Sequence, residues 1–151
     1  MDIPNKWDWG YGRNDIALDE ERAMEHFYGR SLERAEELFA ENAHIYKEDL
    51  MWMPVKPFQF YIMAFINYLK SERSQNDSGA ASAFISLIDF KLENESRFLI
   101  EVWEAVSDAL SYIRERQCWY DADLDIYGDF TMKVDAVLAS AKKKRRFKRK
   151  I

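Results

Sequence analysis

The sequence contains a single cysteine, Cys118, and this excludes an internal disulfide bond. No charged-then-apolar leader precedes Trp7, so we expect no secretory signal. The most apolar stretch, residues 53–69, is interrupted by two prolines and by Lys56. It falls short of the roughly 20 apolar residues that a membrane-spanning helix needs, and it is typical of a buried helix. We therefore expect a soluble, cytoplasmic protein.

Sequence motifs of the common enzyme classes are also missing. There is no Gly-x-Ser-x-Gly elbow, no phosphate-binding loop and no Rossmann fingerprint. Cys118 would need a histidine to act as a nucleophile, and nothing in the sequence places His26 or His44 near it. Beside Trp119 and Tyr120 we expect a partly buried, inert thiol. We predict a non-enzymatic protein without a cofactor.

One acidic segment begins like a calcium-binding loop. Asp121, Asp123 and Asp125 alternate along the chain, as the first ligands of such a loop do. However, Ile126 and Met132 stand where an EF-hand has its glycine and its bidentate glutamate. We predict no metal site here and expect an ordinary acidic loop, although a small metal-dependent enzyme around Asp121 is a third hypothesis.

A second pattern matches half of a carboxylate-bridged di-iron motif. Glu41 and His44 have the Glu-x-x-His spacing that places both side chains on one helix face. The other half is missing, because Ala23 stands three residues before His26. We expect His44 to be a surface histidine among acidic residues.

Apolar residues recur at helical spacing along most of the chain, and strand-like alternation is absent. The sequence predicts an all-α protein with one domain of five to seven helices over residues 19–141. An irregular aromatic arm precedes it at residues 1–18, and a basic tail follows at residues 142–151. Residues 58–69 are apolar nearly all round, which predicts a central aromatic-rich helix.

Polar residues and glycine predict the helix boundaries. Gly29 is expected to end the first helix, and residues 71–79 and 118–128 are expected to be loops. The residues expected to cap or open helices are Asp19, Ser31, Pro57, Asp77 or Ser78, Ser96 and Asp129.

Opposite charges are separated along the chain. Residues 142–150 hold 8 of the 22 basic residues, and without these 8 the formal net charge falls from −5 to −13. If the acidic segments Asp19–Asp49 and Glu93–Asp129 share one side, their field would speed encounter with a basic partner by about 10 to 10³-fold at low salt. An ordinary solvated face is the alternative. The expected partner-binding residues are Glu36, Glu37, Glu41, Glu101, Glu104, Asp108, Asp121, Asp123 and Asp125, with exposed Trp119 or Tyr120 as aromatic anchors.

The basic tail has two interpretations, and both stay open. It either binds phosphate groups of nucleic acid or an anionic membrane, or it folds back on the acidic body of the same chain. Eight phosphate contacts on duplex DNA would give a salt slope of about −7. Phe147 is the single aromatic ring in the tail, and one ring is too few for a base-stacking surface. If the source is eukaryotic, the tail also matches a nuclear-import signal. The polyanion-binding candidates are Lys142, Lys143, Lys144, Arg145, Arg146, Lys148, Arg149 and Lys150.

Five segments together have a distinctive aromatic and helical pattern. They are His26–Ser31, Glu48–Pro54, Phe58–Leu69, Asp77–Ser82 and Ile126–Phe130. In these segments the chain resembles an uncharacterised family of small helical bacterial proteins, some of which are encoded beside toxin genes. The resemblance spans roughly residues 20–138. It implies no enzymatic activity and suggests an immunity or accessory protein that acts by binding. The leading hypothesis is therefore a protein that neutralises a cationic toxin through its acidic surface, and the basic tail departs from that picture.

Overall fold

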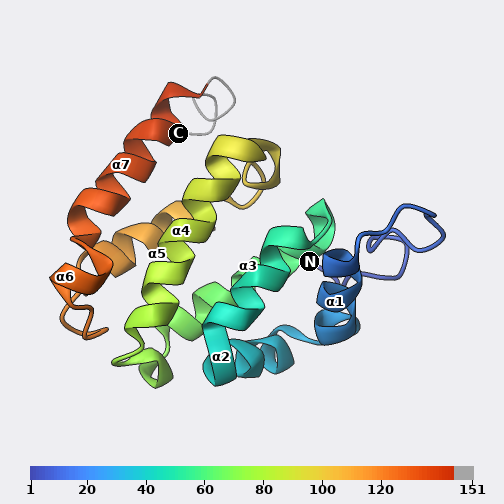
Figure 1. The fold of residues 1–151 in the computed structure, drawn as a ribbon, viewed down its shortest axis with the longest axis horizontal. Helices are drawn as coiled ribbons and strands as arrows, with labels where there is room; N and C mark the ends of the chain where they lie inside the picture. The colour runs from blue at the N-terminus through green and yellow to red at the C-terminus, as the bar shows by residue number, and fades with distance from the viewer. Residues whose placement is uncertain (145–151) are drawn as a thin grey trace.

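The computed structural model describes residues 1–144, and within that range the chain is all-helical, without a strand. This confirms the predicted all-α fold of five to seven helices. The helices in chain order are α1 Leu18–Phe27, α2 Leu32–Trp52, α3 Val55–Lys70, the 3₁₀ turn η1 Glu72–Ser74, α4 Ser78–Asn94, the 3₁₀ turn η2 Ser96–Phe98, α5 Trp103–Arg114, the single turn α6 Leu124–Tyr127 and α7 Phe130–Lys143 (Figure 1).

Helix α3 forms the centre of the bundle, as its sequence predicts. Ten of its sixteen residues are buried, and α2, α4 and α5 all pack against it. The Phe65 ring lies parallel to the Phe39 ring of α2, with centroids 4.6 Å apart, and meets the Phe84 ring of α4 edge-on at 5.4 Å. These are the arrangements that aromatic rings favour in a core. Within residues 1–144, no helix combines the length and the apolar character that crossing a membrane requires.

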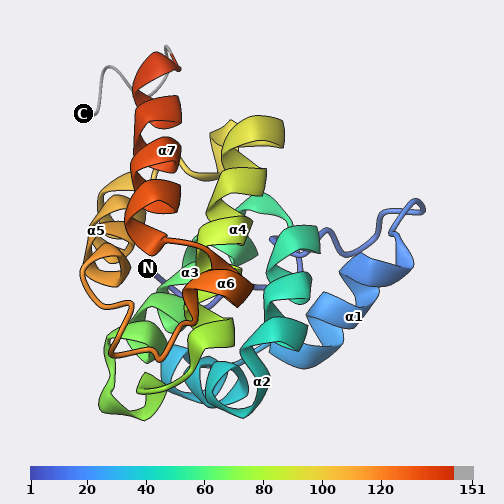
Figure 2. The same cartoon turned by 60° about the vertical axis from the view of Figure 1, so that its left-hand side comes forward.

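Helix α7 packs against both α4 and α5 on the outside of the bundle. Figure 2 shows α5 and α7 side by side, and the two helices are in contact. Residues 1–17 form turns without a helix, and this arm docks through one ring, since Trp9 is buried against Tyr61 while Trp7 and Tyr11 are exposed. The Tyr61 hydroxyl also bonds the carbonyls of Phe27 and Arg30, which ties the end of α1 to α3.

Three predicted N-caps are confirmed. Ser31, Asp77 and Asp129 each accept a hydrogen bond from a first-turn backbone amide, at the starts of α2, α4 and α7. Gly29 also ends α1 as predicted, with the positive φ of 76° that favours glycine. These features depend only on neighbouring residues, so the sequence reveals them.

Other predicted boundaries are wrong. Helix α1 begins at Leu18, so Asp19 lies in the first turn, where its charge still favours the helix dipole. Helix α3 begins at Val55, which leaves Pro57 at its third position, where no intrahelical amide is needed. Ser96 opens the 3₁₀ turn η2 instead of the fifth helix. Residues 118–128 are no continuous loop, because they contain α6.

Lys91 is a buried cation that the sequence pattern does not reveal. Its side chain is fully buried on α4, and its Nζ donates to the Met51 carbonyl at 3.0 Å and to Glu95 at 3.2 Å. The ammonium also lies 4.1 Å from the centre of the Phe98 ring. Burial lowers the pKa of this ammonium, and Glu95 partly offsets that shift. The contacts join the end of α2 to the end of α4 and to η2.

We expect Lys91→Ala to lower the free energy of unfolding by about 2–5 kcal/mol, because it opens a cavity and leaves the Met51 carbonyl unpaired. Lys91→Met should cost clearly less, since it keeps the packing and removes the buried charge. Urea denaturation measures both. Lys143→Met, at an exposed lysine in the last turn of α7, is the control and should stay within about 0.5 kcal/mol of the wild type. Equal losses for Lys91→Ala and Lys91→Met would contradict the packing argument.

Candidate functional site

The predicted acidic contact residues fall into three groups on different elements. Figure 1 shows α2 at the bottom of the bundle and α6 at its left edge, with α5 behind α4. The groups are Glu36, Glu37 and Glu41 on α2, Glu101, Glu104 and Asp108 on or just before α5, and Asp121, Asp123 and Asp125 around α6. Each group is therefore considered separately.

The acids of α5 form one ridge. Glu104 and Asp108 are four residues apart on one face of α5, and Glu101 lies two residues before the helix. All three line the same groove. All three are exposed, while the opposite face of α5 is buried in the core. We call these three residues the α5 ridge.

Two grooves flank the α5 ridge, and both are lined by Glu104 and Asp108. The larger, about 610 Å³, lies between α5, α3 and the N-terminal residue and is called the Met63 groove. The smaller, about 430 Å³, lies between α5 and α7 and is called the Leu138 groove. The Met63 groove is lined by Met1, Met63, Glu101, Val102, Glu104, Ala105 and Asp108. The Leu138 groove is lined by Trp103, Glu104, Ser107, Asp108, Ser111, Leu138 and Lys142.

Two cations at the end of α3 neutralise part of the acidic surface. Lys70 forms an ion pair with Asp108 at one end of the α5 ridge. Arg73 of η1 binds Glu37 of α2 with two hydrogen bonds, of 2.7 and 3.1 Å. Arg73 lowers the pKa of the Glu37 carboxyl, first through these bonds and then through its charge. The α2 group and the Asp108 end of the ridge are thus partly balanced by the chain itself.

The aspartates around α6 act as helix caps. Asp123 accepts hydrogen bonds from the amides of Asp125 and Ile126 and starts α6. Asp129 caps α7, as predicted. Asp121 has a φ of 55°, a left-handed conformation that Asp adopts more readily than most residues. Within residues 1–144, no group of three or more His, Cys, Asp or Glu side chains is placed to hold a metal ion.

The expected aromatic anchors need a correction. Tyr120 is completely buried, and its hydroxyl donates a 2.6 Å hydrogen bond to the Leu69 carbonyl, so it belongs to the core and cannot serve as an exposed anchor. Trp119 is half-buried and meets the Tyr120 ring edge-on. Cys118, expected to be partly buried, is exposed. The fold turns the chain at this point so that Tyr120 faces the end of α3.

A histidine–carboxylate pair was not predicted. His26 Nδ1 on α1 lies 2.6 Å from Asp49 Oδ2 on α2, and Asp49 is buried. Burial raises the pKa of Asp49, while His26 acts in the opposite direction. The Tyr46 ring packs edge-on against the imidazole. The pair links two helices, and no local sequence signal could have found it because its members are 23 residues apart.

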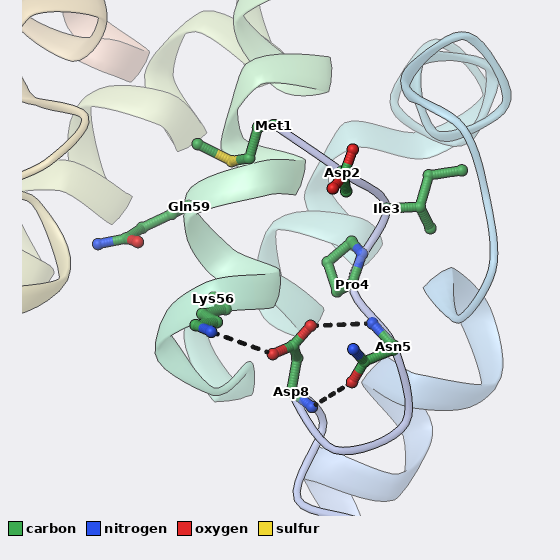
Figure 3. Close-up of a pocket in the computed structure, with 8 residues that line it drawn as sticks. All are labelled: Met1, Asp2, Ile3, Pro4, Asn5, Asp8, Lys56 and Gln59. Carbon is green, nitrogen blue, oxygen red and sulfur yellow. Dashed lines mark hydrogen bonds and ion pairs between the residues drawn. The ribbon is translucent and has the colours of Figure 1, made fainter.

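A further hollow of about 410 Å³ lies between the N-terminal segment and α3 (Figure 3). Asp8 points toward Lys56 there, and its Oδ1 lies 3.5 Å from the Lys56 Nζ. The Asp8 Oδ2 accepts a 2.9 Å hydrogen bond from the backbone amide of Asn5. These contacts fasten the arm to the start of α3. The hollow is therefore a consequence of how the arm docks.

The structure describes only the first part of the basic tail. Lys142 and Lys143 are exposed at the end of α7, and Lys144 is half-buried. The remaining predicted polyanion-binding residues lie outside the described residues: Arg145, Arg146, Lys148, Arg149 and Lys150.

No protein-family model, no curated protein and no solved structure matches this chain. The resemblance to a toxin-neighbouring family therefore stays a prediction, and the site has to be interpreted from its own geometry.

We expect Tyr120→Phe to lower the free energy of unfolding by about 0.5–1.5 kcal/mol at neutral pH, because the Leu69 carbonyl loses one of its two side-chain donors and keeps the Ser74 hydroxyl. Burial raises the pKa of the Tyr120 hydroxyl in the folded state, so the unfolded chain releases this proton first. Stability should therefore fall as the pH rises above about 10, and less steeply in Tyr120→Phe. Urea denaturation between about pH 7 and pH 11 measures both effects.

Tyr28→Phe is the matched control, since Tyr28 is exposed. It should stay within about 0.5 kcal/mol of the wild type at neutral pH. Equal stability of Tyr120→Phe and Tyr28→Phe would contradict the buried position of Tyr120.

Proposed function

We propose that this chain is a non-enzymatic cytoplasmic protein that binds a basic protein partner through the α5 ridge. A cationic toxin, neutralised as by an immunity protein, is the class of partner that fits best. The observation that carries the proposal is the pair of grooves that share Glu104 and Asp108 as their common wall.

Electrostatics supports a basic partner. Residues 1–144 hold all 27 Asp and Glu and 17 of the 22 Lys and Arg, a formal net charge of −10. Such a charge raises the association rate of a cationic protein and lowers that of an anionic one. The α2 acids add to this negative charge, although Glu37 is paired with Arg73. That ion pair is exposed, so Glu37 can exchange Arg73 for an arginine of the partner at little cost in free energy.

The grooves add apolar contact surface to the negative charge of the ridge. Met63 and Ala105 line one groove, and Trp103 and Leu138 line the other, so apolar surface lies on both sides of the carboxylates. Tight interfaces combine apolar or aromatic anchors seated in pockets with a polar rim. An arginine or lysine side chain fits this arrangement, because its stem packs on apolar groups while its head binds a carboxylate.

A photo-crosslinking residue in place of Ser111 tests the proposal in cells that produce the full chain. Ser111 lies on the wall of the Leu138 groove. We expect it to capture one basic protein, whereas the same probe at Asn94, an exposed position on α4, should not capture it. A partner captured equally at both positions, or an acidic partner, would contradict the proposal.

The captured partner then allows a rate measurement. Glu104→Lys with Asp108→Lys should slow its association with the full chain by about tenfold or more at low salt. The control reverses Asp89 and Glu93, two exposed acids with the same spacing on α4, and should change the rate by less than about threefold. Equal effects of the two variants would show that only net charge matters and that the α5 ridge is not the site.

The alternative function is binding of nucleic acid or an anionic membrane through the basic tail. It is favoured by the exposure of Lys142 and Lys143 at the end of α7, where the chain leaves the helix. Replacing all eight basic residues of the tail by glutamine in the full chain should abolish retention on DNA or on acidic vesicles if this function is correct. Unchanged retention would exclude the tail as the binding element.

A further inference from the structure

The Leu138 groove already contains part of the basic tail. Lys142, on the last turn of α7, lines this groove together with Glu104 and Asp108 of α5. Because α5 and α7 run antiparallel, the end of α7 lies beside the start of α5, where Glu104 is located (Figure 2). The tail therefore begins beside Glu104, one of the two acidic residues that line this groove.

The last described residue, Lys144, lies just beyond the end of α7. Helix α7 ends at Lys143, and Lys144 has the extended backbone angles φ −84° and ψ 127°. The groove follows α5 from Glu104 to Ser111, seven residues that span about 10 Å of helix. Six residues can span up to about 20 Å, about twice the length of the groove, so the segment 145–150 can turn back toward Ser111 and still reach along the groove.

Charge and shape are both complementary. Residues 145–150 contain five arginines or lysines and Phe147. The groove has the carboxylates of Glu104 and of Asp108, the latter also paired with Lys70, beside the apolar side chains of Trp103 and Leu138. We propose that residues 145–150 bind along the Leu138 groove of their own chain, with the basic side chains against the α5 ridge and Phe147 on the apolar wall. The tail then acts as an internal ligand that competes with a basic partner.

This inference rests on the proposed function for its biological meaning, since it names an internal competitor for the same ridge. Its test requires no partner. A zero-length carbodiimide coupling on the unmodified full chain joins a lysine ammonium to a carboxylate that it contacts. We expect amide links from Lys148 or Lys150 to Glu104 or Asp108, identified by mass spectrometry of the monomer.

The yield of these links should fall about fivefold or more between about 50 mM and about 500 mM salt, because screening weakens contacts between exposed charges. An equal mixture of ¹⁴N- and ¹⁵N-labelled chains separates internal links from links between two copies. Mixed-isotope products, or links mainly to acids of α2 or α6, would overturn the proposal. So would the absence of links from the tail to the ridge.

A photo-crosslinking residue in place of Phe147 provides an independent measurement, again in the full chain. We expect it to label α5 and α7 next to the Leu138 groove, and Glu104→Lys with Asp108→Lys should lower that labelling about fivefold or more. Reversal of Asp89 and Glu93 is the matched control and should leave it nearly unchanged. Equal losses in both variants would overturn the assignment of the tail to this groove.

The two proposals fail in different ways. If the tail does not couple to the ridge while Ser111 still captures a basic protein, the internal ligand is wrong and the function stands. If the tail couples to the ridge and no basic protein is captured, the internal contact stands without the proposed function.

Discussion

The burial of α3 on nearly every side is the constraint on which the rest of the structure depends. Its exposed and half-buried residues follow one narrow stripe, formed by Val55, Lys56, Gln59, Met63, Asn67 and Lys70. Three of these have defined roles at the surface: Lys56 holds the arm, Met63 lines one groove, and Lys70 pairs with the α5 ridge. The position of the candidate site therefore follows from the one face that α3 leaves uncovered.

The same constraint decides where negative charge accumulates. Helices α2 and α5 turn their apolar faces toward α3, so their acids other than the buried Asp49 face outward. The cations at the end of α3 pair with Glu37 and Asp108. Exposed pairs such as Lys70–Asp108 contribute little to stability, typically below about 1 kcal/mol. Their consequence concerns the surface potential, because Lys70 partly neutralises the Asp108 end of the ridge. The other end of the ridge, at Glu104, lies beside Lys142 at the end of α7.

The sequence predicts local features of this fold and fails where distant segments meet. Ser31, Asp77 and Asp129 cap helices because each contacts an amide two or three residues away. Tyr120 and Lys91 could not be placed in the same way, since their partners, Leu69 and Met51, are 51 and 40 residues away. For the candidate site, helical spacing was enough to group the acids of α5. It could not show that grooves flank them, because Met63 and Leu138 come from other helices.

An internal ligand also changes what a partner must achieve. A segment tethered beside its site competes at an effective concentration in the millimolar range, whatever the concentration of the protein. A partner's apparent affinity is then reduced by the fraction of grooves that the tail leaves open. Weakly basic proteins would be excluded, whereas a partner that also engages the Met63 groove or the α2 acids would retain binding energy that the tail cannot match. The acidic body and the basic tail would thus act together. They would select for a partner whose complementary surface is larger than the one that the tail covers.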